Sequence, residues 1–404
     1  MKTITGGAVA AKGYRCAGVR CGLKVREGAL DLALIVSDAP ALAAGMFTTN
    51  RVKAASVVLD QERVASGRKF RGVIVNAGNA NACTGERGMR DALRMTELAE
   101  KAVGAAPGTF LVCSTGIIGR PMPMEKIVAG VPDAAGKLGR TKAHDEAAQC
   151  AIMTTDLVPK AAAVELSIGG KAVRIGGMCK GSGMIAPNMA TMLAFVTTDC
   201  AISQSLLRKA LRECGGRTFN CVTVDGDCST NDTVLLLSNG AAGNATIRAA
   251  GREYALFVGG LLEVMKRLAQ AIARDGEGAT RFVEVNVIGA RTEKEARRVA
   301  GKIANSPLVK CAVHGGDPNW GRIICAAGYS GEAVEPERMK LRINGVLLFR
   351  NGMPARVTSE KLAACMKPRD IRIVLDLGRG AARSTVWTCD FSKEYVTINA
   401  DYHT

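Results

Sequence analysis

The chain has 404 residues, which is enough for a large core under two or three layers of secondary structure. Its 46 glycines and its aromatic content of only 4% favour a tightly packed α/β enzyme over a β-sandwich. The formal charge of +17 would suit nucleic acid or small anions, but the basic residues are dispersed and not interleaved with aromatic ones, so we interpret them as a solvated surface.

The 14 cysteines form no Cys-x-x-Cys pair, and several lie inside apolar runs. This is typical of small core residues in a reducing compartment, so neither a zinc site nor a disulfide framework is expected. The three histidines share no motif with serine or cysteine, which favours a mechanism whose base is not histidine. No apolar run reaches membrane-spanning length, so we expect a soluble, cytoplasmic protein without a membrane or nucleic-acid partner.

In the first third of the chain, Leu30 to Val36 and Arg71 to Asn76 predict strands, and the apolar face of Asp91 to Val103 predicts a helix. The amide-rich stretch from Asn76 to Gly85 is interpreted as an irregular loop, because such side chains satisfy backbone groups there. A strand over Thr109 to Cys113 follows.

That strand ends at Ser114-Thr115-Gly116. A hydroxyl and a backbone N–H at a strand end can point at one spot, which is the geometry of an oxyanion hole. Most Thr-Gly pairs are simple turns, so the residues alone leave both interpretations open.

A helix over Asp145 to Ile152 leads to Met153-Thr154-Thr155-Asp156. Gly169-Gly170 then predicts a hairpin between Ala163 to Ile168 and Ala172 to Ile175, whose second strand leads to Lys180. Beside glycines, that lysine is either solvated or suited to pairing with a substrate carboxylate.

The stretch from Lys180 to Phe195 begins polar and glycine-rich, passes Pro187 and enters an apolar run at Thr191. Pro187 should stiffen the approach to Ala190 and Thr191. A threonine in this position is usually the first residue of a core strand, but it would also serve as a buried nucleophile.

Further on, Ser203 predicts a helix cap, Cys221 to Val224 predicts a strand, and Leu261 to Ile272 forms a helical stripe. The stripe stops at a turn in which Glu277 lies between two glycines. Glu277 is either a turn carboxylate or a substrate contact.

The remaining predicted elements come from local signals. Thr292 and Glu295 predict a capping box, and Asn344-Gly345 predicts a hairpin turn. Three late strands are predicted, over Ile371 to Leu377, Ser384 to Cys389 and Glu394 to Asn399. The last strand, in which polar and apolar residues alternate, would anchor the tail almost to Thr404.

These segments resemble the ornithine acetyltransferase family of arginine biosynthesis from Gly13 to the last residue. The motifs that carry the resemblance are Cys113 to Gly119, Lys180 to Phe195, Asp317 to Arg322 and Asn399 to Tyr402. The resemblance implies a layered α-β-β-α sandwich of the self-cleaving, N-terminal-nucleophile ornithine acetyltransferase and aminopeptidase kind. It also implies self-cleavage between Ala190 and Thr191 into chains 1–190 and 191–404, which share one interleaved core and form a heterotetramer of two α and two β chains.

The resemblance further implies the residue roles. Thr191 would carry the acetyl group, Thr115 and Gly116 would form the oxyanion hole, and substrate contacts would come from Thr154, Lys180, Thr191, Glu277, Asn399 and Thr404. The implied reaction is ping-pong transfer from N2-acetylornithine to glutamate. The new α-amine of Thr191, with an ordinary pKa of about 7.7 to 8.0, would be the base.

No metal or cofactor is expected, and the sequence leaves open whether acetyl-CoA is also a donor. The alternative is an N-terminal-nucleophile amidohydrolase or aminopeptidase, in which water replaces glutamate. A phosphate-binding protein is disfavoured, since Gly181-Ser182-Gly183 lacks the full Walker spacing.

Overall fold

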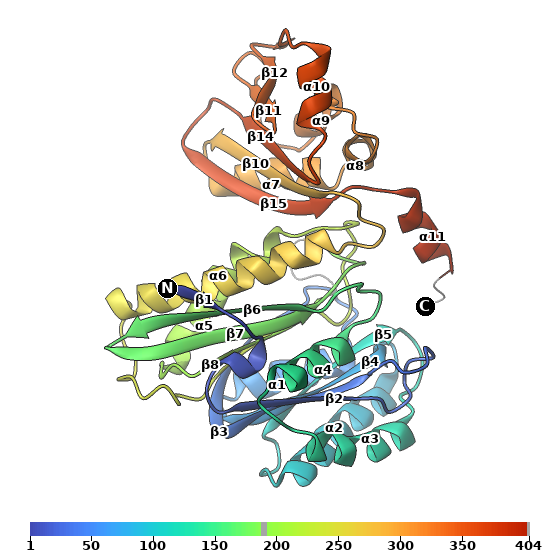
Figure 1. The fold of residues 1–404 in the computed structure, drawn as a ribbon, viewed down its shortest axis with the longest axis vertical. Coiled ribbons are helices and arrows are strands. Elements are labelled where there is room, and N and C mark those ends of the chain that lie inside the picture. The colour runs from blue at the N-terminus through green and yellow to red at the C-terminus, as the bar shows by residue number, and fades with distance from the viewer. Residues whose placement is uncertain (187–191, 402–404) are drawn as a thin grey trace.

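The structure is a computed structural model that describes residues 1–186 and 192–401 (Figure 1). The predictions on Ala190, Thr191 and Thr404 therefore lie outside the described residues. The described chain forms a nine-stranded sheet and a six-stranded sheet with helices on their faces, so the predicted α/β class is confirmed.

The larger sheet combines strands from both sides of residues 187–191. Its order is β1-β6-β7-β8-β9-β3-β4-β5, and β2 pairs with β3 beside that path. The strands are β1 (Lys2–Ile4), β2 (Tyr14–Val19), β3 (Leu32–Phe47), β4 (Phe70–Asn79), β5 (Phe110–Ile117), β6 (Lys160–Ile168), β7 (Lys171–Lys180), β8 (Leu193–Thr198) and β9 (Thr233–Ser238). Because β8 and β9 lie between β7 and β3, segments before and after residues 187–191 build one sheet.

Strand β3 divides this sheet into two halves. Residues 32–37 pair with β2, and residues 42–47 pair with β9. Pro40 lies between them and has no N–H to donate to a ladder, and the pairing with β4 shifts register between Val36 and Ala41. The strand can therefore leave one half of the sheet and enter the other.

Helices enclose the two halves. The helices of this part are α1 (Ala55–Ala65), α2 (Gly85–Val103), α3 (Met124–Gly136), α4 (Lys142–Ile152), α5 (Gln204–Gly216) and α6 (Arg252–Arg274), with a short 3-10 helix η1 (Ala8–Ala10). One core lies between α5, α6 and the β6–β9 half, a second between α2, α3 and the β2–β5 half, and a third between the halves themselves. Figure 1 shows these layers in sequence, which confirms the α-β-β-α sandwich.

The sequence explains the central layers. All six residues of β8 and all six of β9 are buried, as expected for neighbouring parallel strands covered on both faces. Leu261, Leu268 and Ile272 of α6 are fully buried, which confirms the predicted stripe. Each such leucine stabilises the fold by about 2 kcal/mol.

The smaller sheet has a core of its own, for which the sequence analysis found no signal. Its order is β13-β12-β11-β14-β10-β15. The strands are β10 (Phe282–Ala290), β11 (Lys340–Ile343), β12 (Val346–Arg350), β13 (Met353–Pro354), β14 (Asp370–Asp376) and β15 (Ala382–Cys389), and the helices are α7 (Glu293–Ala304), α8 (Pro307–His314), α9 (Trp320–Gly328) and α10 (Ser359–Cys365).

Local signals in this part behaved as predicted. Asn344 and Gly345 join β11 to β12 with φ of 45° and 85°, the two left-handed positions of a type I′ turn. The Thr292 side chain caps α7 by accepting a hydrogen bond from the Glu295 N–H at 3.1 Å. In the larger part, Ser203 precedes α5 as predicted, but its side chain makes no capping hydrogen bond there.

The predicted strand over Cys221 to Val224 is wrong. The segment contains the end of a 3-10 helix η2 (Phe219–Cys221), followed by an isolated bridge from Val222 to Trp387. The apolar residues are buried as expected, but they fill the space beside β15 instead of joining a sheet.

The predicted strand over Glu394 to Asn399 is also wrong, because the segment forms helix α11 (Lys393–Asp401). Five alternating residues are too few to exclude a helix, and within the described chain no strand pairs with this segment. Tyr395 in the first turn of α11 stacks on Phe391, which precedes the helix, with ring centroids 4.8 Å apart.

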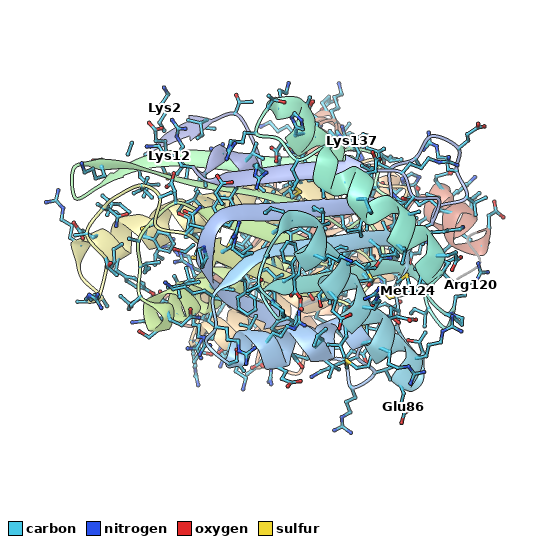
Figure 2. All side chains as sticks on the ribbon, turned by 90° about the horizontal axis from the view of Figure 1, so that it is seen from below. Lys2, Lys12, Glu86, Arg120, Met124 and Lys137 are labelled. Atoms are coloured by element: carbon cyan, nitrogen blue, oxygen red, sulfur yellow. The ribbon has the colours of Figure 1, made fainter. Side chains whose placement is uncertain are left out.

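The surface charge is spread over many elements. Figure 2 shows Lys2 and Lys12 near each other at the upper left of the view, with Lys137 and Arg120 well away from them. In the ranges 1–186 and 192–401, no helix combines the length and apolarity that crossing a bilayer requires.

Candidate active site

A cavity of about 100 Å³ lies where β5 and β7 end and the chain enters β9 and β10. Its lining brings together six residues that the sequence analysis proposed for the site, namely Thr115, Gly116, Thr154, Lys180, Glu277 and Asn399. The other lining residues are Ala80, Ile118, Thr155, Gly183, Met184, Ser229, Thr230 and Asn231. Ala190, Thr191 and Thr404 are outside the described residues.

Close strand packing positions Thr115 and Gly116. Gly116 is the register partner of Gly78 on β4, and its φ of 128° is unfavourable for other residues. A Cβ on Gly116 would lie 2.4 Å from the Gly78 carbonyl carbon, so the glycine is required here. The hydroxyl of Thr115, a 4% exposed residue, makes no hydrogen bond to any residue in the described ranges.

Lys180 is the last residue of β7 and is only 2% exposed. Its ammonium group donates no hydrogen bond within the described chain, and the nearest carboxylate oxygen, Asp156 Oδ2, is 4.0 Å away. Burial lowers the pKa of Lys180, and the attraction of Asp156 offsets only part of this effect. A buried cation with free donors at a cavity wall is suited to binding an anion.

A buried ion cluster supports this wall. Lys160 Nζ lies 2.6 Å from Asp156 Oδ1 and 2.5 Å from Asp275 Oδ2. Burial by itself would raise the pKa of Asp156, but the ammonium groups of Lys180 and Lys160 outweigh burial and hold that pKa at about 2. Lys160 Nζ and the Gly181 N–H both donate to Asp156 Oδ1, whereas Lys180 Nζ lies 4.0 Å from Oδ2, which is too far for a hydrogen bond. The donors of Lys180 can therefore still reach a ligand in the cavity.

Glu277 and Asn399 also line the cavity. Asn399 Nδ2 on α11 donates to Glu277 Oε2 at 2.9 Å, and the Glu277 N–H donates to the Ser182 carbonyl oxygen. A Cβ on Gly183 would lie 2.2 Å from Glu277 Oε2, so this glycine makes room for the carboxylate. The cavity thus holds a cation and a carboxylate, the two charges that an amino acid needs.

Asn231, which lines the cavity, and Asp232 directly precede β9 and were not among the predicted site residues. Asn231 Nδ2 donates to the carbonyl oxygens of Ala80 and Ser114 at 2.6 and 2.8 Å, which fixes the loop next to Thr115. Asp232 is fully buried, accepts the Met192 N–H at 2.9 Å, and has a pKa that burial raises well above its usual value. The run of hydroxyl and amide residues directly before a buried strand was the signal that could have identified them.

The irregular loop predicted over residues 76–85 is shorter in the structure, because residues 76–79 are the end of β4 and Gly85 begins α2. Its asparagine side chains do satisfy backbone groups as expected. Asn76 and Asn79 donate to backbone carbonyl oxygens within or near the loop, and the Asn81 N–H donates to Asn79 Oδ1 at 2.8 Å. Only Ala80 of this loop lines the small cavity.

Comparison with known proteins finds relatives that match nearly the whole sequence. The model of the ArgJ family matches residues 15–404. The chain is 47% identical over 405 residues to the arginine biosynthesis bifunctional protein ArgJ of Symbiobacterium thermophilum, covering 100% of both chains. It is 49% identical over 394 residues to the protein of the same name from Geobacter sulfurreducens, covering 97% of this chain and 99% of the relative.

A solved structure is also similar. The crystal structure of the arginine biosynthesis bifunctional protein argJ from Bacillus halodurans aligns with a TM-score of 0.50 at 42% sequence identity. The alignment covers 52% of this chain and 98% of that one.

Proposed function

The chain belongs to the ArgJ family, and on that premise we propose that it transfers the acetyl group of N2-acetylornithine to glutamate through an acetyl-Thr191 intermediate. Membership in the family makes the chain an acyltransferase of arginine biosynthesis. The observation that carries the finer proposal is the small cavity, in which Thr115 and Gly116 share a wall with buried Lys180 and with Glu277.

In the proposed maturation, the Thr191 hydroxyl attacks the Ala190 carbonyl and the peptide bond becomes an ester. Hydrolysis of the ester releases the Ala190 carboxylate and the Thr191 α-amine. The parts should remain associated, because β8 and β9 lie inside the sheet that β3 and β7 complete. We propose that two copies of each part then form a heterotetramer, which native mass measurement tests.

In the proposed cycle, the Thr191 α-amine takes the hydroxyl proton while the oxygen attacks the acetyl carbonyl of acetylornithine. Thr115 and Gly116 donate to the oxyanion, and ornithine leaves with the proton on its α-amine. The α-amine of glutamate then attacks the acetyl ester, N-acetylglutamate leaves, and the Thr191 hydroxyl is restored. No cofactor enters this cycle.

We assign charge recognition to the two charged residues that line the cavity, Lys180 and Glu277. Lys180 would bind the α-carboxylate that both substrates share, and Glu277, held by Asn399, would bind the side-chain amine of ornithine. Thr154 lines the same cavity and would contact the bound substrate there.

The assignment to Lys180 predicts a shared defect. Lys180→Met should raise the Michaelis constants for acetylornithine and for glutamate by about 10- to 100-fold each, because one charge-assisted contact is lost in both half-reactions. Steady-state kinetics with each substrate varied in turn measure this. A change confined to one substrate would refute a common carboxylate site.

The experiment that tests the function compares transfer with hydrolysis. Purified enzyme with acetylornithine alone should release little acetate, whereas added glutamate should produce N-acetylglutamate and ornithine in equal amounts. Rapid acetate release that is indifferent to glutamate would favour the amidohydrolase instead. A parallel incubation with acetyl-CoA and glutamate determines whether acetyl-CoA is a second donor.

The carboxyl terminus provides another prediction. Deleting Asp401 to Thr404 should leave self-cleavage intact but lower acetyl transfer at least about tenfold, because the tail continues from the helix whose Asn399 holds Glu277. Gel analysis of cleavage and transfer kinetics measure the two effects separately. Normal kinetics would remove Thr404 from the site, and loss of cleavage as well would mean that the tail supports folding.

A further inference from the structure

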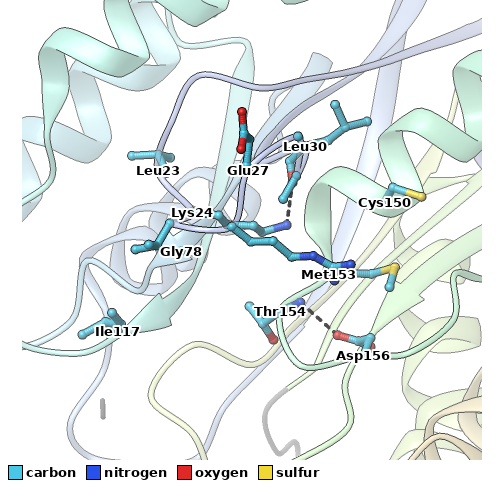
Figure 3. A pocket seen from close by; sticks show the side chains of 14 residues that line it. Leu23, Lys24, Glu27, Leu30, Gly78, Ile117, Cys150, Met153, Thr154 and Asp156 are labelled. Carbon is cyan, nitrogen blue, oxygen red and sulfur yellow. Dashed lines mark hydrogen bonds between the residues drawn. The ribbon is translucent and has the colours of Figure 1, made fainter. Parts of the chain in front are cut away.

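A second, larger cavity of about 700 Å³ adjoins the small one. Thr154 lines both cavities. Figure 3 shows the larger cavity between the loop that carries Leu23, Lys24 and Glu27 and the end of α4 at Cys150, with Met153 and Thr154 beyond it. Its walls are mostly apolar, and the charged residues that line it are two cations, Lys24 and Arg26, and two carboxylates, Glu27 and Asp156. Asp156 is already paired with Lys160, which lies outside the lining.

The loop that forms this cavity is held in place from within. The carboxylate of fully buried Asp31 accepts four backbone N–H groups, those of Cys21, Gly22, Leu23 and Lys24, at 2.6 to 3.1 Å. A buried carboxylate satisfied by four donors fixes the backbone of residues 21–24. Lys24 therefore extends from a rigid segment.

Lys24 is positioned between this loop and α4. Its Nζ donates to the carbonyl oxygens of Leu30 at 2.5 Å and Ala151 at 3.5 Å, which leaves one of its three donors for a ligand. Burial lowers the pKa of Lys24 to about 8, while Asp31 and Asp156 act to raise it and Lys180 to lower it. The group is thus largely charged at neutral pH, and a carboxylate that binds it would raise its pKa.

This segment lies close to the acyl-transfer chemistry. A Cβ on Gly78 would lie 3.0 Å from the Leu23 carbonyl oxygen and 3.3 Å from the Lys24 backbone nitrogen. Gly78 in turn is the register partner of Gly116. The loop of Lys24 is therefore packed one strand away from the proposed oxyanion hole.

Charge matching separates the two substrates. Both carry an α-carboxylate, but the side chain of ornithine (the donor arm) ends in an ammonium group and the side chain of glutamate (the acceptor arm) ends in a second carboxylate. Of the described residues that line the small cavity, Lys180 is the only cation and Glu277 the only carboxylate. The arm of ornithine suits Glu277, whereas the arm of glutamate would be repelled by it.

We propose that the larger cavity is the acceptor subsite, in which Lys24 binds the side-chain carboxylate of the acceptor amino acid while Lys180 holds its α-carboxylate. The inference rests on the proposed function and deepens it. The donor arm and the acceptor arm then point to opposite sides of Thr154. Because the cavity is larger than the glutamate arm, acceptors with one more methylene, such as 2-aminoadipate, should also be acetylated.

The test uses the full-length, self-processed enzyme. In a ping-pong cycle, kcat/KM for the acceptor reports only the second half-reaction, and kcat/KM for acetylornithine reports only the first. Lys24→Met should lower kcat/KM for glutamate by about 10- to 100-fold and leave kcat/KM for acetylornithine within about twofold. With glutamine as acceptor, which lacks the second charge, wild type and variant should be alike.

Two controls separate charge from structure. Lys126→Met removes an exposed lysine that donates to the Gly22 carbonyl oxygen of the same loop but does not line the cavity, and it should leave both constants unchanged. Lys24→Arg should recover much of the activity with glutamate. A Lys24→Met defect that is equal for glutamate and glutamine would overturn the proposal.

Filling the cavity gives an independent measurement. Cys150 lines it from α4, so Cys150→Phe should raise the Michaelis constant for glutamate while Cys150→Ser stays close to wild type. If Cys150→Phe and Lys24→Met both impair acetylornithine instead, the cavity takes the donor arm and the proposal is overturned. If wild-type enzyme transfers no acetyl group at all, the proposed function has failed and not merely the subsite.

Discussion

Replacing Thr191 with alanine is expected to leave a single uncut chain of 404 residues that has no transferase activity. The hydroxyl is needed twice, first to attack the Ala190 carbonyl and then to carry the acetyl group, and alanine supplies it for neither step. Wild type should instead give fragments of 190 and 214 residues (404 minus 190) under denaturing conditions. Intact mass spectrometry distinguishes the two patterns.

Thr191→Ser is the matched control, because serine keeps the hydroxyl and removes only a methyl group. It should cleave and retain measurable transfer, although at lower rates. A fully active wild-type enzyme that consists of one uncut chain would contradict the mechanism. Cleavage in Thr191→Ala would move the nucleophile to another residue.

The second large effect is expected at Thr115. Thr115→Val keeps the shape of the side chain but removes the hydroxyl, which makes no hydrogen bond within the described chain and faces the cavity. If that hydroxyl donates to the oxyanion, kcat should fall about 10²- to 10³-fold, or about 3 to 4 kcal/mol of transition-state stabilisation. Because the substitution removes no hydrogen bond between described residues, folding should be unaffected.

The kcat of Thr115→Val should be measured on the self-processed fraction alone, so that slow self-cleavage is not mistaken for slow acetyl transfer. Thr115→Ser is the control and should recover most of the rate. A thermal unfolding midpoint close to that of wild type would exclude a folding defect. Wild-type kinetics in Thr115→Val would assign the oxyanion contacts to backbone N–H groups alone.

The turns and the apolar face of α6 could be predicted from the sequence because the preferences that determine them involve only a few neighbouring residues. Gly169-Gly170 and Asn344-Gly345 turn the chain where they were expected to, since positive φ is a local requirement that glycine and asparagine meet. The stripe of α6 was readable because helical periodicity places its apolar residues on one face.

Short segments without such signals were misread. The tail was predicted as a strand from five alternating residues, yet it forms α11, whose N-terminal end can approach the Glu277 turn because Gly278 has no side chain. A Cβ on Gly278 would lie 2.5 Å from the Tyr395 nitrogen. Whether a short segment becomes a strand depends on a partner strand elsewhere, and alternation alone does not reveal one.

For the site, the local sequence indicated Lys180 beside glycines and Glu277 between two glycines as candidates. The family resemblance added their roles. Only the tertiary structure brings Lys160 to Asp275, 115 residues away, and Asn399 to Glu277, 122 residues away. The second pair holds Glu277 in place, and the Lys180 ammonium makes no hydrogen bond to any of the described residues. The local sequence determines turns and periodic faces, whereas the charges that meet in a buried cavity depend on strand order and on glycine contacts between distant segments, which no short stretch of chain encodes.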